Sequence, residues 1–134
     1  MSGTYEATTR GIRVTVQPQY LADRSSPKDG QWVWTYEVRL ENHGQDTVQL
    51  LTRHWLIVDG NGTKEEVRGA GVVGDQPRLD PGESYTYTSG CPLKTPSGFM
   101  SGSYGMVDGE GQAFDVEIPA FALDLPNATT GALN

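Results

Sequence analysis

The strongest constraint on the fold is a stretch in which apolar and polar side chains alternate. Residues 32–41 read WVWTYEVRLE. A period of two puts the apolar residues on one face of an extended strand and the others on the opposite face, and a helical period fits them badly. The apolar face consists of Trp32, Trp34, Tyr36, Val38 and Leu40. We therefore expect a long strand whose aromatic face is covered by other parts of the chain.

Several other segments carry strand patterns separated by turn residues. They are residues 12–16, 63–68, 83–89, 100–107 and 112–118. Pro18 is expected to stop the first of them, and the polar residues 1–9 are expected to be mobile. No helical stretch is longer than one turn. Seven or eight short strands predict an all-β fold, an antiparallel β-sandwich of the immunoglobulin or fibronectin type III kind. We expect a single domain over residues 1–126 and a disordered tail over residues 127–134.

Residues 48–58 form a further strand with less regular alternation. They read VQLLTRHWLIV, and an unbroken period of two leaves both faces partly apolar. One interpretation is a central strand covered on both sides, because buried strands lose their alternation. The other is that Leu51 and Trp55 form an exposed patch that contacts a partner protein or a second copy of the chain. The sequence leaves both open.

Charge and cysteine content limit the classes of partner. The formal net charge is −7 and the isoelectric point is near 4.6, which argues against binding nucleic acid or an anionic membrane. Cys91 is the single cysteine, so no internal disulfide can form, as is usual in a reducing compartment. The N-terminal residues show no apolar signal segment, and no eighteen apolar residues run together. We expect a soluble cytoplasmic protein.

A glycine-rich loop follows residues 63–68. Gly69, Gly71 and Gly74 fit the spacing GxGxxG of dinucleotide-binding folds. The next residues contain Pro77 and Pro81, which prevent the helix that such a site needs, so a Rossmann site is excluded. Three interpretations remain: a structural bulge and turn, a protein-contact loop, or an anion site in which amides act with Arg68 or Arg78.

The residues that could carry catalysis do not form a recognisable set. Cys91 has no histidine near it in sequence, which favours a buried free thiol over a nucleophile. His43 and His54 are too few and too far apart for a zinc site. Neighbouring carboxylates at positions 65 and 66 point to opposite faces of a strand. We therefore predict no catalytic residues, no metal site, no cofactor and no enzymatic activity.

The central stretch of the chain combines several unusual short motifs in one order. They are RGAGVVG at 68–74, LDPGE at 79–83, YTSG at 87–90, Leu93, Thr95, Pro96, Gly98, Met100, Gly102, Tyr104 and Met106. In these residues the chain resembles the ApaG family, a small bacterial domain also found appended to certain F-box proteins and polymerase-delta-interacting proteins. The similarity extends outward to residues 36–38, 41–42 and 50–55, so it covers nearly the whole chain.

The resemblance implies a fibronectin type III-like sandwich, often dimeric. It implies a link by phenotype to cobalt resistance and magnesium efflux, and a link by gene neighbourhood to enzymes of dinucleoside polyphosphate metabolism. It also implies that the glycine loop binds pyrophosphate or nucleotides, as has been proposed for the family. The eukaryotic relatives imply a module that recruits other proteins.

Two functional hypotheses follow from the residues and the resemblance. The first is a non-catalytic module that binds another protein, or a second copy of itself, through Leu51, Trp55 and the loop at residues 69–74. The alternative is a phosphate, pyrophosphate or nucleotide binder that uses Arg68, Gly69, Gly71 and Gly74. A phosphoanhydride hydrolase fits least, since no carboxylate cluster for magnesium is visible.

Overall fold

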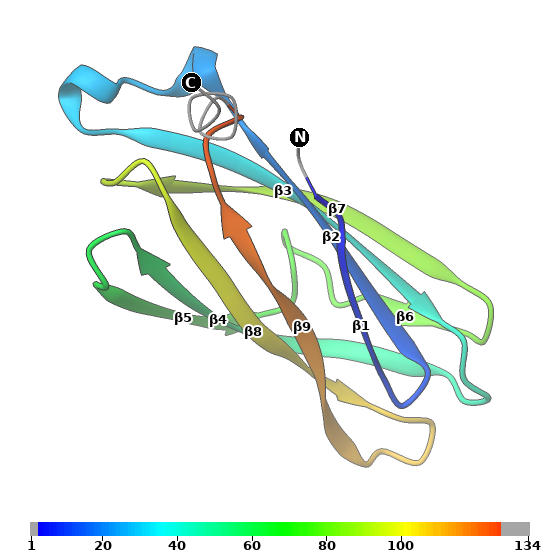
Figure 1. Cartoon of the computed structure of the whole chain (residues 1–134). Helices are drawn as coiled ribbons and strands as arrows, with labels where there is room; N and C mark the ends of the chain where they lie inside the picture. The colour runs from blue at the N-terminus through cyan, green and yellow to red at the C-terminus, as the bar shows by residue number, and fades with distance from the viewer. Residues whose placement is uncertain (1–2, 127–134) are drawn as a thin grey trace.

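The computed structural model describes residues 3–126, which form a sandwich of two antiparallel sheets (Figure 1). One sheet has the strand order β1-β2-β3-β7, and the other has the order β5-β4-β8-β9 with β6 paired to β4. The predicted fold class is confirmed, although nine strands occur in the described part instead of seven or eight. The strands are β1 (Tyr5–Thr9), β2 (Ile12–Tyr20), β3 (Trp32–Asn42), β4 (Val48–Asp59), β5 (Lys64–Ala70), β6 (Arg78–Leu79), β7 (Ser84–Leu93), β8 (Gly98–Val107) and β9 (Ala113–Leu123). Two single-turn 3₁₀ helices, η1 (Ala22–Arg24) and η2 (Pro27–Asp29), connect β2 to β3.

Strand β3 buries its aromatic face as the alternation predicts. Trp34, Tyr36, Val38 and Leu40 are buried, while Trp32 at the strand's start is only half-buried. Strand β3 pairs with β2 along one edge and with β7 along the other, so it is a central strand of its sheet. This strand supplies much of one wall of the core.

Two expectations about the N-terminal part were wrong. Residues 5–9 are not mobile polar chain but form β1, which pairs with residues 12–16 of β2. Strand β2 does not stop at Pro18 but continues to Tyr20. Because β1 extends only to the position opposite Val16, Pro18 has a partner strand on one side alone, and its missing N–H is tolerated there. The tail expected to be disordered, residues 127–134, lies outside the described residues.

Strand β4 contains a β-bulge that the sequence pattern hides. Its register against β8 shifts between Leu50 and Thr52, and the extra residue reverses the alternation. Arg53 therefore faces the core opposite Tyr104, on the same side of the sheet as Leu50 and Trp55. The bulge explains why Trp55 and Ile57 face the core. Leu56 and Val58 follow the outer side instead and keep it partly apolar.

The predicted exposed patch of Leu51 and Trp55 is therefore wrong. Trp55 is only 3% exposed, and its ring packs edge-on against Tyr36, Tyr104 and Phe121 at centroid distances of 5.2, 6.4 and 6.0 Å. Leu51 is half-buried at the bulge. The alternative was a central strand covered on both sides. Strand β4 is central, between β5 and β8, but it is not covered on both sides, because Thr52 is exposed on the outer face.

The two long sides of the sandwich are closed differently. On one side β1 and β2 lie against β9, and the rings of Tyr5 and Phe121 are 6.1 Å apart. On the other side the edge strands β5 and β7 face each other without pairing. Figure 1 shows the segment between β5 and β6 rising between the two sheets at this open side.

Among residues 3–126, no helix is long and apolar enough to cross a membrane.

Candidate functional site

The glycine-rich loop contains a tight turn at the open side of the sandwich. Val72 and Asp75 exchange both backbone hydrogen bonds, each 2.8 Å long, around Val73 and Gly74. Both central residues have positive φ, 41° at Val73 and 87° at Gly74, as in a type I′ turn. Glycine adopts this conformation freely, but a β-branched residue with positive φ is a steric outlier. Val73 is nevertheless 56% exposed, so the turn presents a strained apolar side chain to solvent.

Two backbone amides of the loop are already engaged within the protein. The N–H of Gly71 donates to the carbonyl of Leu51, and the N–H of Val72 donates to the carbonyl of Asp75, each at 2.8 Å. Gly71 has a φ of 65°, and a Cβ there would lie 2.3 Å from the carbonyl oxygen of Asp75. These two amides thus hold the turn itself and are not free to surround an anion.

Arg68 does not join the loop amides either. Its side chain is 72% exposed, and it pairs with Glu66 at 3.3 Å. Arg68 lies opposite His54 of β4, whose neighbours Arg53 and Trp55 face the core, so Arg68 is on the outer face of the sheet. The structure therefore does not bring Arg68 together with Gly69, Gly71 and Gly74 as the anion-site hypothesis required. Binding of pyrophosphate or a nucleotide stays a prediction, and it lacks the cluster of Arg68 with the loop glycines on which it was based.

A different arginine lies beneath the loop. Arg53 donates two hydrogen bonds from Nη1, to the carbonyls of Ala70 at 2.9 Å and Gly71 at 2.8 Å. Its cross-strand neighbour is Gly69, where a Cβ would lie 2.7 Å from the guanidinium carbon. A glycine at position 69 therefore makes room for the guanidinium, and a glycine at 71 permits the turn. These two glycines serve the packing of Arg53 and the loop.

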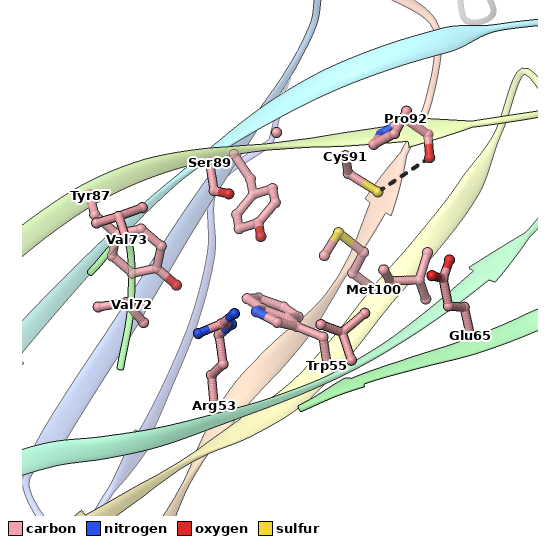
Figure 2. Close-up of a pocket in the computed structure, with 14 residues that line it drawn as sticks. Arg53, Trp55, Glu65, Val72, Val73, Tyr87, Ser89, Cys91, Pro92 and Met100 are labelled. Carbon is pink, nitrogen blue, oxygen red and sulfur yellow. Dashed lines mark hydrogen bonds between the residues drawn. The ribbon is translucent and has the colours of Figure 1, made fainter. Parts of the chain in front are cut away.

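A cavity of about 390 Å³ lies between the open edges of the two sheets. Figure 2 shows side chains from both sheets pointing into it, with Arg53, Trp55 and Met100 rising from one sheet toward Ser89 and Cys91 on the other. Val72 and Val73 lie at one end of the cavity, and Glu65 lies at the other. We call this cavity the slot. It is lined by Tyr36, Arg53, Trp55, Ile57, Glu65, Val67, Val72, Val73, Tyr87, Ser89, Gly90, Cys91, Pro92 and Met100.

The phenols and the thiol of the slot are neutral near pH 7. Burial, together with a smaller effect of the charge of Glu65, raises the pKa of the Cys91 thiol to about 11. Burial also raises the pKa of Tyr36 and of Tyr87, while the nearby charge of Arg53 acts against both shifts. The slot therefore offers uncharged hydroxyl and thiol groups around one guanidinium and one carboxylate. Cys91 is a buried free thiol, as predicted.

The histidines and paired carboxylates lie elsewhere in ordinary contacts. His54 contacts Glu66 at 2.7 Å on the outer face, and His43 contacts Glu41 at the same distance. Within residues 3–126, no three His, Cys, Asp or Glu side chains gather as they would around a metal ion. Asp108 accepts hydrogen bonds from the backbone of Glu110 and Gln112, which stabilise its own turn.

Sequence reasoning did not identify the slot. An unbroken period of two puts Arg53 on the face of Leu51, away from Val48 and Leu50. The bulge between Leu50 and Thr52 reverses this and leaves no mark in the alternation. The one available signal was the glycine opposite Arg53, and it is informative only once the pairing of β4 with β5 is known. Cys91, Tyr36 and Tyr87 converge there from strands whose order only the fold sets.

Comparison with known proteins gives consistent matches along most of the chain. A protein-family model described as the ApaG domain matches residues 22–108. Protein ApaG from Rhodospirillum centenum is 61% identical over 123 residues, which cover 92% of this chain and 95% of that protein. Protein ApaG from Mesorhizobium japonicum is 58% identical over 122 residues, covering 91% and 94%. A crystal structure from Bordetella pertussis that bears the name ApaA has a TM-score of 0.83 at 46% identity, covering 90% of this chain and 95% of that one.

Proposed function

The chain belongs to the ApaG domain family, and on that premise we propose that it is a non-catalytic module that binds another protein at the open side of its sandwich. The proposed contact surface consists of the turn at residues 72–75 and the adjoining edges of β5 and β7. It replaces the predicted patch of Leu51 and Trp55, which the fold buries or half-buries. The glycine loop stays in the proposal.

The observation that carries the proposal is the conformation of Val73. A left-handed backbone at a β-branched residue costs on the order of 1–3 kcal/mol, and such strain gathers at functional positions. The isopropyl group, 56% exposed, also gains little from burial to offset this cost, so the stability of the fold does not account for valine at this position. Asparagine, aspartate or glycine would serve a type I′ turn better. An apolar contact with a partner supplies a reason for the valine.

The surroundings of the turn support a protein contact. Strands β5 and β7 each have a sheet neighbour on one edge only, so their outer edges carry backbone groups that an added strand can pair with. The turn is held against β7 by the hydroxyl of Tyr85, which donates to Asp75 at 2.8 Å. The apolar tip is thus presented on a fixed support between two edges.

We place this binding module in the cytoplasm and link it, through the family resemblance, to cobalt resistance and magnesium efflux. In this proposal the link runs through the partner protein and not through a metal bound by the chain itself. A second copy of the chain is the simplest partner that the surface could meet.

The test is the substitution Val73→Asn. Asparagine relieves the strain, so we expect the free energy of unfolding to rise by about 1 kcal/mol in urea titrations. We expect partner binding to weaken at the same time, measured as loss of the cross-link formed by a photoreactive phenylalanine analogue at position 70, an exposed site of the edge strand β5 beside the turn. If Val73→Asn is more stable but forms less of the cross-link, Val73 serves binding and not the stability of the fold.

The control is Phe99→Ser. Phe99 is the other large apolar side chain that is exposed among residues 3–126, at 46%. It pairs opposite Val58 on β8, away from the turn. We expect this variant to retain the cross-link. Retention of the cross-link by Val73→Asn, with the same yield as the unmodified chain, would refute the proposal. A cross-linked product of twice the chain's mass would identify the partner as a second copy.

A further inference from the structure

Arg53 is a half-buried cation without a carboxylate partner. Arg10, Arg13, Arg39 and Arg68 each lie within 4.0 Å of a carboxylate oxygen, whereas Arg53 has none that close among residues 3–126. Burying a guanidinium is costly unless its charge and N–H groups are satisfied. The two hydrogen bonds that it makes, to the carbonyls of Ala70 and Gly71, both come from Nη1. Nε and Nη2 make no hydrogen bond within residues 3–126 and are not sealed from solvent, so their N–H groups are open to another acceptor.

The charge of Arg53 is directed into the slot. Figure 2 shows its guanidinium beside Trp55, in the space between the sheets. Three buried phenols, those of Tyr36, Tyr87 and Tyr104, all experience its positive charge. None of these groups is ionised near pH 7, so they donate or accept hydrogen bonds without neutralising the arginine.

The slot is also polarised along its length. Glu65 pairs opposite Ile57 in β4, four residues beyond Arg53, so the two charges are roughly 13 Å apart along the strands. Between them the walls are apolar or aromatic, formed by Trp55, Met100 and Val67. An anion entering the slot is attracted to the loop end and repelled from the other end.

We infer that the slot binds a small organic carboxylate with a flat apolar body. The carboxylate lies on the free N–H groups of Arg53, and the apolar body lies against Trp55 and Met100. The inference goes beyond the proposed protein contact, which uses the outside of the turn and the strand edges. It makes the chain a binding module whose open side holds a ligand beneath the contact surface.

Charge and size select this class over polyphosphates. The lining contains one guanidinium and one carboxylate, which matches a single negative charge and not the several charges of pyrophosphate or a nucleotide. A guanidinium fork pairs well with one carboxylate in a bidentate arrangement. The volume of about 390 Å³ is at the small end of the range for ligand pockets, enough for a body of one or two rings.

The experiment titrates the ¹⁵N-labelled full chain with 3-phenylpropionate and with its neutral amide, 3-phenylpropionamide. We expect saturable shifts of the Trp55 indole N–H and of the amides of residues 69–72 with the acid, and at least tenfold weaker binding of the amide. Benzoate, indole-3-acetate and hexanoate extend the panel, and pyrophosphate tests the competing class.

Three substitutions test the role of charge, one at each end of the slot and one on the outer face as a control. Arg53→Gln removes the charge but keeps a donor for the loop carbonyls, and we expect it to weaken binding of the acid at least tenfold. Retained peaks for residues 71–75 will show that the loop stays folded in this variant. Glu65→Gln removes the repulsive charge, so binding should be unchanged or tighter. Arg68→Gln, on the outer face, should leave binding unchanged.

Several results would overturn the inference. The acid and the amide could bind equally well, or the shifts could be confined to the surroundings of Arg68. Pyrophosphate could give stronger shifts at Arg53 than any carboxylate does. Finally, no member of the panel could give a saturable shift by about 10 mM. The protein contact is tested separately by Val73→Asn, which leaves the slot's charges intact. Either proposal can therefore fail while the other holds.

Discussion

The side of the sandwich where β1 and β2 meet β9 differs from the side where β5 faces β7. On the first, side chains join the sheets directly: the guanidinium of Arg10 lies 4.2 Å from the ring centre of Phe114, and the hydroxyl of Thr9 accepts the N–H of Glu117. On the second, a cavity separates the edges, and the turn at residues 72–75 occupies one end of it. We refer to these as the closed side and the open side.

The difference shows where the chain departs from optimal local structure. The closed side consists of paired strands over buried apolar residues of β9, which ordinary folding energetics explains. Arg10 in the turn between β1 and β2 also has a positive φ, 49°, but its side chain is not β-branched and lies against the ring of Phe114. The open side contains a valine with positive φ, a half-buried arginine without a carboxylate, and an unfilled volume. Natural sequences keep such features where binding requires them. The open side is therefore the part of the molecule in which we place function.

The largest effect on stability is expected from the closed side. Phe121 is 1% exposed and lies within 6.1 Å of the rings of Tyr5, Tyr36 and Trp55. Phe121→Ala removes this ring from a close-packed site, and we expect the free energy of unfolding to fall by about 3–5 kcal/mol in urea titrations. Phe99→Ala, the same change at an exposed position, should cost less than about 0.5 kcal/mol. Similar losses at the two positions would contradict the packing described here.

An intermediate effect is expected from the two glycines of the open-side turn. Gly71→Ala places a Cβ against the carbonyl oxygen of Asp75 and also forces alanine to a φ of 65°, so we expect a loss of about 2–3 kcal/mol. Gly74→Ala meets a φ of 87° with open space around it, and its cost should be about 1 kcal/mol. Thermal and urea unfolding of both variants measure the difference. Equal costs would show that crowding at Gly71 has no effect.

The smallest effect is expected from a charge near the closed side. Hydrogen bonds from the backbone of Gln112 and Glu110 lower the pKa of Asp108, and the charge of Arg10 adds to this. Because the folded pKa is below the unfolded one, the contribution to stability is present above about pH 4 and is lost as the pH falls through the folded value. Asp108→Asn keeps the oxygen acceptor without the charge. It should flatten the dependence of the unfolding free energy on pH below about pH 4. An unchanged slope would assign that dependence to other carboxylates.

The sequence was a good guide wherever local alternation decided the structure. Residues 34, 36, 38 and 40 were predicted to share a buried face and do so, because a strand alternates whatever its neighbours are. The turn residues at 59–62 and 108–111 fixed two hairpins for the same local reason. The fold class followed from these segments, and the resemblance to the ApaG family agreed with it.

The candidate site could be predicted only in part. The glycine loop was identified, but Arg68 was chosen as its cation, since it is adjacent in sequence. The arginine that lies under the loop is Arg53, fifteen or more residues earlier and on another strand. Sequence neighbours in a strand point to opposite faces, so adjacency to the loop put Arg68 on the wrong side of the sheet.

The sequence by itself determined most of the strands, several of their turns, and which residues of β3 are buried, because these depend on short-range geometry and hydrophobicity. Only the tertiary structure decided the bulge at Leu51, the burial of Trp55, the pairing of β1, and the convergence of Arg53 with Tyr36, Tyr87 and Cys91. A bulge and an open edge are properties of how two strands meet. The free energy that selects them comes from contacts between residues far apart in the chain.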